Sequence, residues 1–271
     1  MKISGNILKM ESKYIDATTP VEYTLPIGSE KLALNPLIGS HISFHFDGVI
    51  NCIATGEKIK KSYNQGYSYK AFLKLAACDI CIVRPELCHY HKGTCREPKW
   101  GEQHCMIPHV VYLAQSSHVK VGITRHSQIP YRWIDQGATR ALPILKVPNR
   151  YISGLVEREI AQYLPDRTNW RKMLLGECDE EQDLSRMRES IYLQHGDFLD
   201  QVGAEDVDDP PCEITYPILQ LPKRINSLSF DKTPKIEGTL FGIKGQYLIF
   251  DTGVVNMRKH QGYHLEILKV S

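Results

Sequence analysis

Hydrophobic and polar residues alternate in short runs at both ends of the chain, a pattern typical of β-strands with one buried face. Residues 1–71 contain runs such as HISFHF at 41–46, and turn residues such as those at 47–48 break the runs into short strands. Residues 213–271 contain GTLFGIKGQYLIFDTGVVNMRK, in which glycines separate paired strands. The pattern therefore predicts an N-terminal β unit over 1–71 and a C-terminal β unit over 213–271.

The middle of the chain mixes strand and helix periods. HVVYLA and VKVGIT predict a β-hairpin, IPYRWIDQ a short helix that ends at Gly137, and ALPILKV a further strand. ISGLVEREIAQYL has apolar residues at helical spacing, which predicts an amphipathic helix. We expect an αβ domain over 108–176, followed by an acidic helix and a Pro-Pro-Cys linker over 177–212. The fold class that these elements predict is α+β.

Composition narrows the class of protein. Of the 271 residues, 42% are hydrophobic and 24% are charged, which is the balance of a folded globular protein. No run of about 18 apolar residues is present, so the sequence predicts no membrane span. The first residues, MKISGNILKMESKY, contain no apolar segment of the secretory type. We therefore expect a cytoplasmic protein.

Charge is distributed in blocks although the formal net charge is only +2. Residues 51–100 carry a net charge of +5 and residues 106–172 a net charge of +6, whereas residues 173–209 carry −10. Basic blocks suit a nucleic-acid partner, because Lys and Arg displace the counterions of phosphates. The alternative is that each block is a solvated face, and the acidic block is interpreted first as a solvated helix. A sharper hypothesis is that the acidic block covers a basic cleft as a phosphate mimic.

A cysteine-rich segment over 72–107 carries the strongest local signal. Its core, CDICIVRPELCHYHKGTCREPKWGEQHC, offers thiol and imidazole ligands at Cys78, Cys81, Cys88, Cys95, Cys105, His89, His91 and His104. The C-x2-C spacing of Cys78 and Cys81 lets two thiolates bind one tetrahedral metal ion. Clustered cysteines in a chain with no predicted secretion favour zinc over disulfides. We expect one structural zinc held by four of the five cysteines; buried, reduced cysteines without a metal are the alternative.

A second group of residues has the spacing of a metal knuckle but lacks the ligands. Cys52 precedes Thr55 by three positions, and Ser68 precedes Ala71 by the same interval. One thiolate does not hold zinc unaided. The N-terminal β unit is therefore predicted to contain a degenerate knuckle and no metal.

The run VVYLAQSSHVKVGITRHSQIPYRWIDQGA at 110–138 resembles the opening of a GIY-YIG nuclease domain. In that superfamily two strands carry the name-giving motifs, a helix carries an arginine, and a later helix carries a metal-binding glutamate. Tyr112 matches the first motif at its tyrosine. Lys120-Val121-Gly122 matches the second at its glycine, as in the branch with lysine in place of tyrosine.

Three further residues of this chain match the superfamily pattern. Arg132 falls on the predicted short helix and Glu157 on the amphipathic helix, and Asn169 follows at the distance of the family asparagine. By this resemblance, Tyr112 helps to activate water, Arg132 contacts the phosphate and Glu157 holds Mg²⁺ or Mn²⁺. Lys120 then supplies a second phosphate contact and Asn169 an orienting hydrogen bond.

The same residues have structural explanations. Tyr112 alternates with apolar strand residues and is typical of a core tyrosine. Arg132 with Trp133 is also typical of a packed cation–aromatic pair. On the amphipathic helix, periodicity alone favours Glu159 over Glu157, because Glu159 projects closer to the centre of the apolar face. We follow the family spacing and keep Glu159 as the competitor.

The chain as a whole resembles an uncharacterised prokaryotic family known only as a domain of unknown function. The shared pattern includes NQGY, the C-x2-C followed by PELCHYHKGTC, and GIKGQYL, and it covers most of residues 50–260. Members of that family carry cysteines where this chain has Thr55, Ser68 and Ala71. The expected fold is α+β, with small β units flanking a zinc-stabilised segment and a GIY-YIG-like αβ domain.

These observations predict a protein that binds nucleic acid, either DNA or RNA. The favoured activity is metal-dependent hydrolysis of phosphodiester bonds. The alternative is a zinc-containing protein that binds DNA or RNA on a nuclease-like scaffold without cleaving it. The two differ in whether Tyr112, Arg132 and Glu157 meet in one site.

Overall fold

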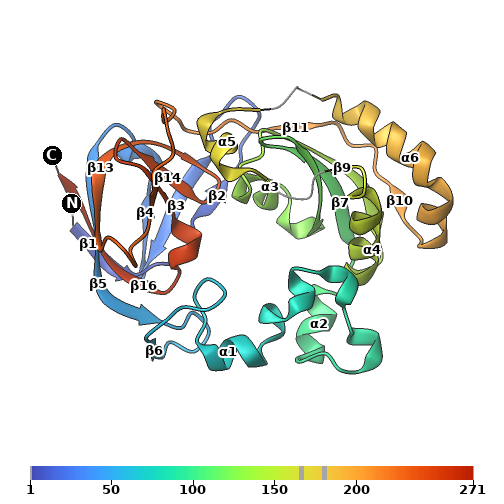
Figure 1. The fold of residues 1–271 in the computed structure, drawn as a ribbon, viewed down its shortest axis with the longest axis horizontal. Helices are drawn as coiled ribbons and strands as arrows, with labels where there is room; N and C mark the ends of the chain where they lie inside the picture. The colour runs from blue at the N-terminus through green and yellow to red at the C-terminus, as the bar shows by residue number, and fades with distance from the viewer. Residues whose placement is uncertain (1, 165–167, 179–181, 271) are drawn as a thin grey trace. The chain divides into compact units, whose positions relative to one another are not determined.

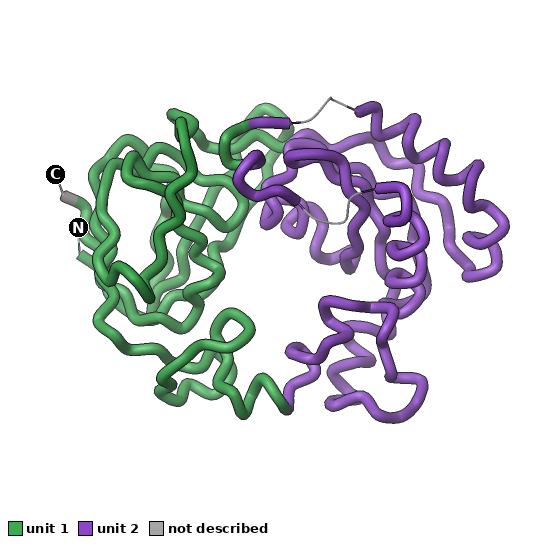
Figure 2. Tube along the Cα trace, viewed as in Figure 1, with its two compact units in different colours: residues 1–73, 174–176, 214–271 green, residues 74–173, 177–213 purple. Residues whose placement is uncertain are grey.

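The computed structural model describes residues 2–164, 168–178 and 182–270 and has a mixed α+β fold, as the sequence predicts (Figure 1). The chain divides into two compact units (Figure 2). Unit 1 comprises residues 1–73, 174–176 and 214–271, and unit 2 comprises residues 74–173 and 177–213. No described helix combines the length and apolar character that crossing a membrane requires.

Unit 1 is built on a sheet that joins the two ends of the chain. The sheet order is β1-β16-β5-β13-β14-β15-β12, with β6 paired to β5. These strands are β1 (Lys2–Asn6), β16 (Tyr263–Val270), β5 (His41–Asn51), β13 (Lys235–Lys244), β14 (Tyr247–Phe250), β15 (Val254–Asn256), β12 (Ser227–Leu228) and β6 (Lys58–Ile59). Lys2 pairs with Leu268 in antiparallel register, so the N-terminal and C-terminal β segments form one structure.

A run of buried residues in β5 suits its place between β16 and β13 in this sheet. Ile42, Ser43 and Phe44 are buried, whereas His41 and His45 on either side of them are exposed. A second sheet in unit 1 has the order β2-β3-β4. Its strands are β2 (Glu11–Lys13), β3 (Glu22–Ile27) and β4 (Glu30–Ala33). The other regular elements of residues 1–74 and 214–270 are the helix α1 (Tyr69–Lys74) and the 3₁₀ helices η1 (Asn35–Leu37) and η7 (Met257–His260).

Unit 2 contains the predicted hairpin and its neighbours. The sheet has the order β10-β9-β7-β8, with β11 also paired to β9. The strands are β7 (His109–Gln115), β8 (Val119–Arg125), β9 (Arg140–Val147), β10 (Glu205–Asp206) and β11 (Cys212–Glu213). The helices are α2 (Pro98–His104), α3 (Tyr131–Asp135), α4 (Arg150–Ile160), α5 (Trp170–Leu175) and α6 (Leu184–Gln201), with a 3₁₀ turn, η6 (His126–Gln128), after β8. The hairpin, the short helix, the strand and the amphipathic helix are confirmed as predicted.

The core of unit 2 lies between this sheet and two helices. Val111 and Leu113 of β7 pack with Val156 of α4 and with Ile191 and Leu199 of α6 in one apolar cluster. Aliphatic side chains of this kind each contribute about 1.5–3 kcal/mol on burial. The acidic segment therefore supplies a helix to the core, in addition to its exposed charges. Residues 179–181 of that segment lie outside the described residues.

The cysteine-rich segment folds as a series of short helical turns. They are η2 (Ala76–Cys78), η3 (Ile80–Ile82), η4 (Pro85–Leu87) and η5 (Tyr90–Lys92), followed by α2. The segment is attached to the start of α4 by Arg150. Its guanidinium donates hydrogen bonds to the carbonyl oxygens of Cys81 (3.4 Å) and Ile82 (2.5 Å), and its backbone N–H donates to Cys105 (2.8 Å).

Candidate functional site

Four of the five clustered cysteines surround one small cavity. The cavity has a volume of about 20 Å³, and its lining includes Cys81, Cys88, Cys95 and Cys105. They come from η3, the end of η4, the loop before α2 and the end of α2. Cys78 is buried but does not line the cavity. Of the C-x2-C pair, Cys81 therefore lines the cavity and Cys78 does not.

These thiols also influence one another electrostatically. The pKa of Cys81 is raised to about 12, because burial and the neighbouring Asp79, Cys88 and Cys105 raise it by more than Arg150 lowers it. Burial likewise raises the pKa of Cys105, with Cys88 and Cys95 adding to the effect. Thiolates so placed repel each other, and a bound cation removes that repulsion. Four cysteine sulfurs are a ligand set that Zn²⁺ prefers.

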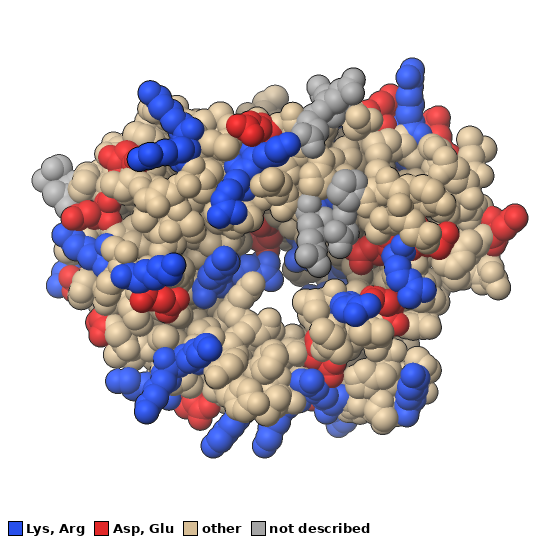
Figure 3. All heavy atoms as spheres, viewed as in Figure 1, with Lys and Arg blue, Asp and Glu red and all other residues tan. Residues whose placement is uncertain are grey.

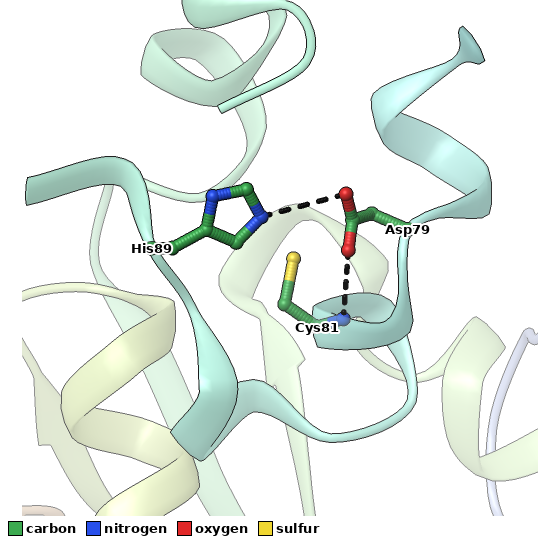
Figure 4. A group of neighbouring side chains, drawn as sticks. All are labelled: Asp79, Cys81 and His89. Carbon is green, nitrogen blue, oxygen red and sulfur yellow. Dashed lines mark hydrogen bonds and ion pairs between the residues drawn. The ribbon is translucent and has the colours of Figure 1, made fainter. Parts of the chain in front are cut away.

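Asp79 and His89 line the same cavity, and Asp79, Cys81 and His89 place one potential ligand atom each within 4.8 Å of one another (Figure 4). The Asp79 carboxylate has other partners: Oδ2 pairs with Arg96 Nε (2.6 Å) and His89 Nε2 (3.4 Å), and Oδ1 accepts from the Cys81 N–H (3.4 Å). His89 Nδ1 lies 2.7 Å from the Thr94 hydroxyl. Asp79 and His89 are therefore held by hydrogen bonds and ion pairs in the lining of the same cavity as the thiols.

The degenerate knuckle around Cys52 is a compact hydrogen-bonded site. Cys52 is buried, and its sulfur accepts a hydrogen bond from the Ser68 N–H (3.2 Å), while the Ser68 hydroxyl accepts from the Ala71 N–H (3.2 Å). Burial opposes ionisation of Cys52, but hydrogen bonds from the Thr55 side chain and from backbone amides outweigh it and lower the pKa to about 7. The positions 52, 55, 68 and 71 thus come together without four metal ligands.

Tyr112 lies in the centre of β7 and has no exposed surface. Its hydroxyl donates a hydrogen bond to Gln136 Oε1 (3.0 Å), and its ring packs edge-on against Trp133 of α3. Directly opposite on β8 is Gly122, where an added Cβ would stand 2.7 Å from the Tyr112 hydroxyl and ring carbon Cζ. Glycine is required at this position because only the missing side chain leaves room for the ring.

Basic groups come to the same place from two other elements. Arg132 on α3 forms a hydrogen bond with the Tyr112 hydroxyl, and Lys120 on β8 is 6% exposed. Burial raises the pKa of Tyr112, an effect that Glu157 reinforces and Arg132 opposes. At neutral pH the phenol therefore keeps its proton.

Glu157 on α4 joins this group. The pKa of its carboxyl is raised to about 7, because burial and, to a smaller extent, Glu86 raise it by more than Arg132, Arg150 and Lys120 lower it. In the part of the chain that the structure describes, the Glu157 carboxylate forms no hydrogen bond or ion pair. It is a half-buried acid surrounded by cations at a distance, without a direct partner.

The competing glutamate lies elsewhere. Glu159 Oε1 is 3.4 Å from His195 Nδ1 of α6, and its other oxygen accepts from the side chain of Gln162 (2.8 Å). Tyr112, Lys120, Arg132 and Glu157 are thus brought together, whereas Glu159 faces α6.

Asn169 forms hydrogen bonds that stabilise the local structure. Its side-chain oxygen accepts from the N–H groups of Arg171 (3.2 Å) and Lys172 (3.3 Å) at the start of α5, and its own N–H donates to the Ser117 hydroxyl (3.0 Å). These bonds cap α5 and tie it to the turn of the hairpin. The predicted orienting role of Asn169 stays a prediction.

Sequence reasoning missed three residues of this site: Glu86, Gln136 and Arg150. Glu86 lies between Cys81 and Cys88, and no motif in the sequence marks it as a site residue. Arg150 directly follows Asn149, the N-cap of α4, and this position is the only signal that could have drawn attention to it. Glu86 and Arg150 belong to this site because of the way the cysteine-rich segment packs on α4.

Charges on the visible face of the molecule are interspersed. Lys and Arg side chains alternate with Asp and Glu over both units (Figure 3). The charge blocks of the sequence therefore do not produce a single basic field on this face. An interaction with phosphate at the candidate site would depend instead on the group of Tyr112, Lys120, Arg132 and Glu157 in unit 2.

Comparison with known protein families matches residues 39–265 to DUF2797, described as a protein of unknown function. Searches of curated proteins and of solved structures gave no match. The matched range includes the cysteine-rich segment, the hairpin, α4 and most of the C-terminal β segment. Because it spans most of the chain, the protein belongs to the DUF2797 family.

Proposed function

We propose that this protein is a metal-dependent, GIY-YIG-like nuclease that hydrolyses phosphodiester bonds in DNA or RNA. The observation that carries the proposal is the position of Glu157. Its carboxylate shares an electrostatic environment with Tyr112 and Arg132, which come from different elements, and it has no direct partner among the described residues. A half-buried acid of this kind is costly to the fold unless it serves a ligand.

The donor chemistry fits a hard divalent cation. A glutamate oxygen suits Mg²⁺ or Mn²⁺, which retain several waters when bound to protein. Such a cation, when bound, offsets phosphate charge and lowers the pKa of water. In this proposal Glu157 is its ligand.

The remaining residues act on the phosphate and on water. Arg132 and Lys120 supply positive charge for the equatorial oxygens of the pentacoordinate phosphate, where negative charge develops. Tyr112 keeps its proton at neutral pH, so it does not act as the base, and its hydroxyl orients Arg132 by a hydrogen bond. Gln136 in turn fixes the Tyr112 hydroxyl. Hydrolysis forms one P–O bond with water and breaks one to the leaving oxygen, which takes a proton.

The second part of the proposal is a structural zinc at Cys81, Cys88, Cys95 and Cys105. It is supported by the shared cavity and by the mutual electrostatic effect of the thiols. A site closed by four sulfurs leaves no position for substrate, so its role is to hold the short turns of residues 76–104 together. Asp79 and His89 line the same cavity as these thiols.

Cleavage assays test the activity. The full-length chain is incubated with branched DNA, single-stranded DNA and a tRNA-like RNA in Mg²⁺ or Mn²⁺. Glu157→Ala is expected to abolish cleavage, and Glu159→Gln, the matched control on the same helix, is expected to retain it. Equal cleavage by wild type and Glu157→Ala would contradict the assignment of Glu157.

A second candidate function is nucleic-acid binding without cleavage. The observation that favours it is that Tyr112 has no exposed surface and its hydroxyl is already hydrogen-bonded to Gln136. In that case the three substrates bind to the wild-type chain and none is cut. Absence of both binding and cleavage would contradict both candidates.

A further inference from the structure

A lysine-rich segment of unit 1 lies outside the candidate site. Residues 58–73, KIKKSYNQGYSYKAFL, contain four lysines and no acidic residue. All four are exposed, and none of them forms an ion pair with another described residue: they are Lys58, Lys60, Lys61 and Lys70. Lys and Arg side chains gather over β6 and α1 in the space-filling view (Figure 3). The segment therefore presents positive charge that is available to an anionic partner.

Aromatic rings stand among these lysines. The ring centre of Tyr63 lies 5.1 Å from that of Tyr69 and 6.2 Å from that of Phe72, and the rings of Tyr63 and Phe72 are stacked. The ammonium group of Lys61 lies 5.4 Å from the centre of the Tyr63 ring. Tyr69 is nevertheless 54% exposed. The cluster thus holds the Tyr69 ring from one side and leaves much of its surface for a further ring.

A tight loop fixes the position of Tyr63 beside this cluster. Tyr63 and Tyr67 exchange both backbone hydrogen bonds, at 2.9 and 2.8 Å. Between them Asn64 and Gln65 adopt positive φ angles of 42° and 64°, and both residues are exposed. Gln65 Oε1 accepts a hydrogen bond from Arg258 Nε of η7 (2.9 Å), which brings a further cation to the same surface. The loop therefore adds exposed amides and an arginine to the lysines and rings.

This combination fits single-stranded nucleic acid. Lysines contact phosphates, and an exposed aromatic ring stacks on an unpaired base, whatever the base is. Exposed amides form hydrogen bonds with the edges of splayed bases. A duplex keeps its bases stacked on one another and offers Tyr69 no base face. An anionic membrane would also attract the lysines, but amides between the rings do not suit insertion among lipids.

We propose that residues 58–73 bind single-stranded DNA or RNA, with Tyr69 stacking on a base and Lys60 and Lys61 contacting phosphates. The inference rests on the proposed function in taking nucleic acid as the partner. It adds a binding surface in unit 1 to the candidate site in unit 2. This surface requires neither Glu157 nor a divalent cation.

Fluorescence anisotropy tests the surface apart from cleavage. Labelled oligo-dT and oligo-rU of about 16 nucleotides are added to the full-length chain without Mg²⁺ or Mn²⁺. Tyr69→Ala is expected to weaken binding about tenfold, whereas Tyr69→Phe, which keeps the ring, is expected to bind as wild type does.

Salt dependence tests the lysines. Each phosphate contact with a single strand contributes about 0.7 to the slope of log affinity against log salt concentration. Lys60→Gln combined with Lys61→Gln is therefore expected to reduce that slope by about 1.4. The matched control is Lys223→Gln combined with Arg224→Gln, an exposed basic pair of unit 1 outside this segment, which is expected to leave the slope unchanged.

The outcomes separate this inference from the proposed function. Weaker binding by Tyr69→Ala, with Tyr69→Phe and the control pair unchanged, supports the surface. Equal affinity of Tyr69→Ala and wild type overturns it, as does tighter binding of a matched duplex, or binding to phosphatidylserine vesicles and not to the oligonucleotides. Because no cleavage is measured, each of these failures leaves the assignment of Glu157 standing. Cleavage that survives Glu157→Ala would in turn leave this surface standing.

Discussion

Replacing Glu157 with glutamine tests the electrostatics of the candidate site by its effect on stability. The ordinary pKa of this carboxyl is 4.5, and burial raises it to about 7 in the folded protein. A raised folded-state pKa means that the protonated carboxyl stabilises the fold relative to the ionised one. That contribution is fully present below pH 4.5 and is lost as the pH rises through about 7. Glutamine, which does not ionise, avoids the loss.

The magnitude follows from the two pKa values. Each pKa unit corresponds to about 1.4 kcal/mol, so ionisation of Glu157 costs the fold about 3 kcal/mol at pH 8. At pH 5 the carboxyl is largely protonated when folded, and the cost is less than about 1 kcal/mol. We therefore expect Glu157→Gln to exceed wild type in unfolding free energy by about 3 kcal/mol at pH 8, and by about 2 kcal/mol less at pH 5.

Urea unfolding at the two pH values, without added divalent cations, measures this difference. The tryptophans Trp100, Trp133 and Trp170 all lie in unit 2, so their fluorescence reports the unit that contains Glu157. Gly196→Ala is the control: an added Cβ meets no atom within 4 Å, and alanine stabilises a helix interior by about 1 kcal/mol at either pH. A gain for Glu157→Gln that is the same at both pH values would refute the electrostatic reasoning.

Two further predictions concern the glycine opposite Tyr112 and the zinc ligands. Gly122→Ala is expected to destabilise unit 2 by about 1–3 kcal/mol in the same fluorescence assay, because its Cβ collides with the buried Tyr112 ring; stability equal to wild type would show that the ring moves aside. Elemental analysis is expected to find about one zinc per wild-type chain. Cys95→Ser should lose that zinc, whereas Cys178→Ser, at an exposed cysteine, should keep it; equal zinc in both variants would contradict the ligand set.

The local elements of unit 2 were predictable because their signals lie within a few residues. Alternation in HVVYLA and VKVGIT predicted β7 and β8, and Gly137, in the left-handed region at φ +71°, follows α3 as expected. The capping of α4 by Asn149 and the apolar spacing of ISGLVEREI likewise depend only on neighbours along the chain. The α+β class follows from counting such segments.

The composition of the metal cluster was only partly predictable. The spacing of Cys78 and Cys81 indicated that these two thiols act together, yet only Cys81 lines the cavity with the other three. Spacing fixes how far apart two side chains can be along the backbone. It does not fix which way each side chain points once the chain turns, and the short 3₁₀ turns of this segment decide that.

The sequence by itself determined the short-range features: the strands, the helices, the cysteine-rich segment and the residues that resemble a nuclease motif. Tertiary structure decided that β1 pairs with β16, that Glu157 and not Glu159 lies near Tyr112, and that Glu86 approaches α4 at Gly154. The physical reason is the range of the interactions. Propensity and periodicity act over a few residues, whereas these contacts join positions far apart in the chain, or choose between two faces of one helix, and only packing specifies them.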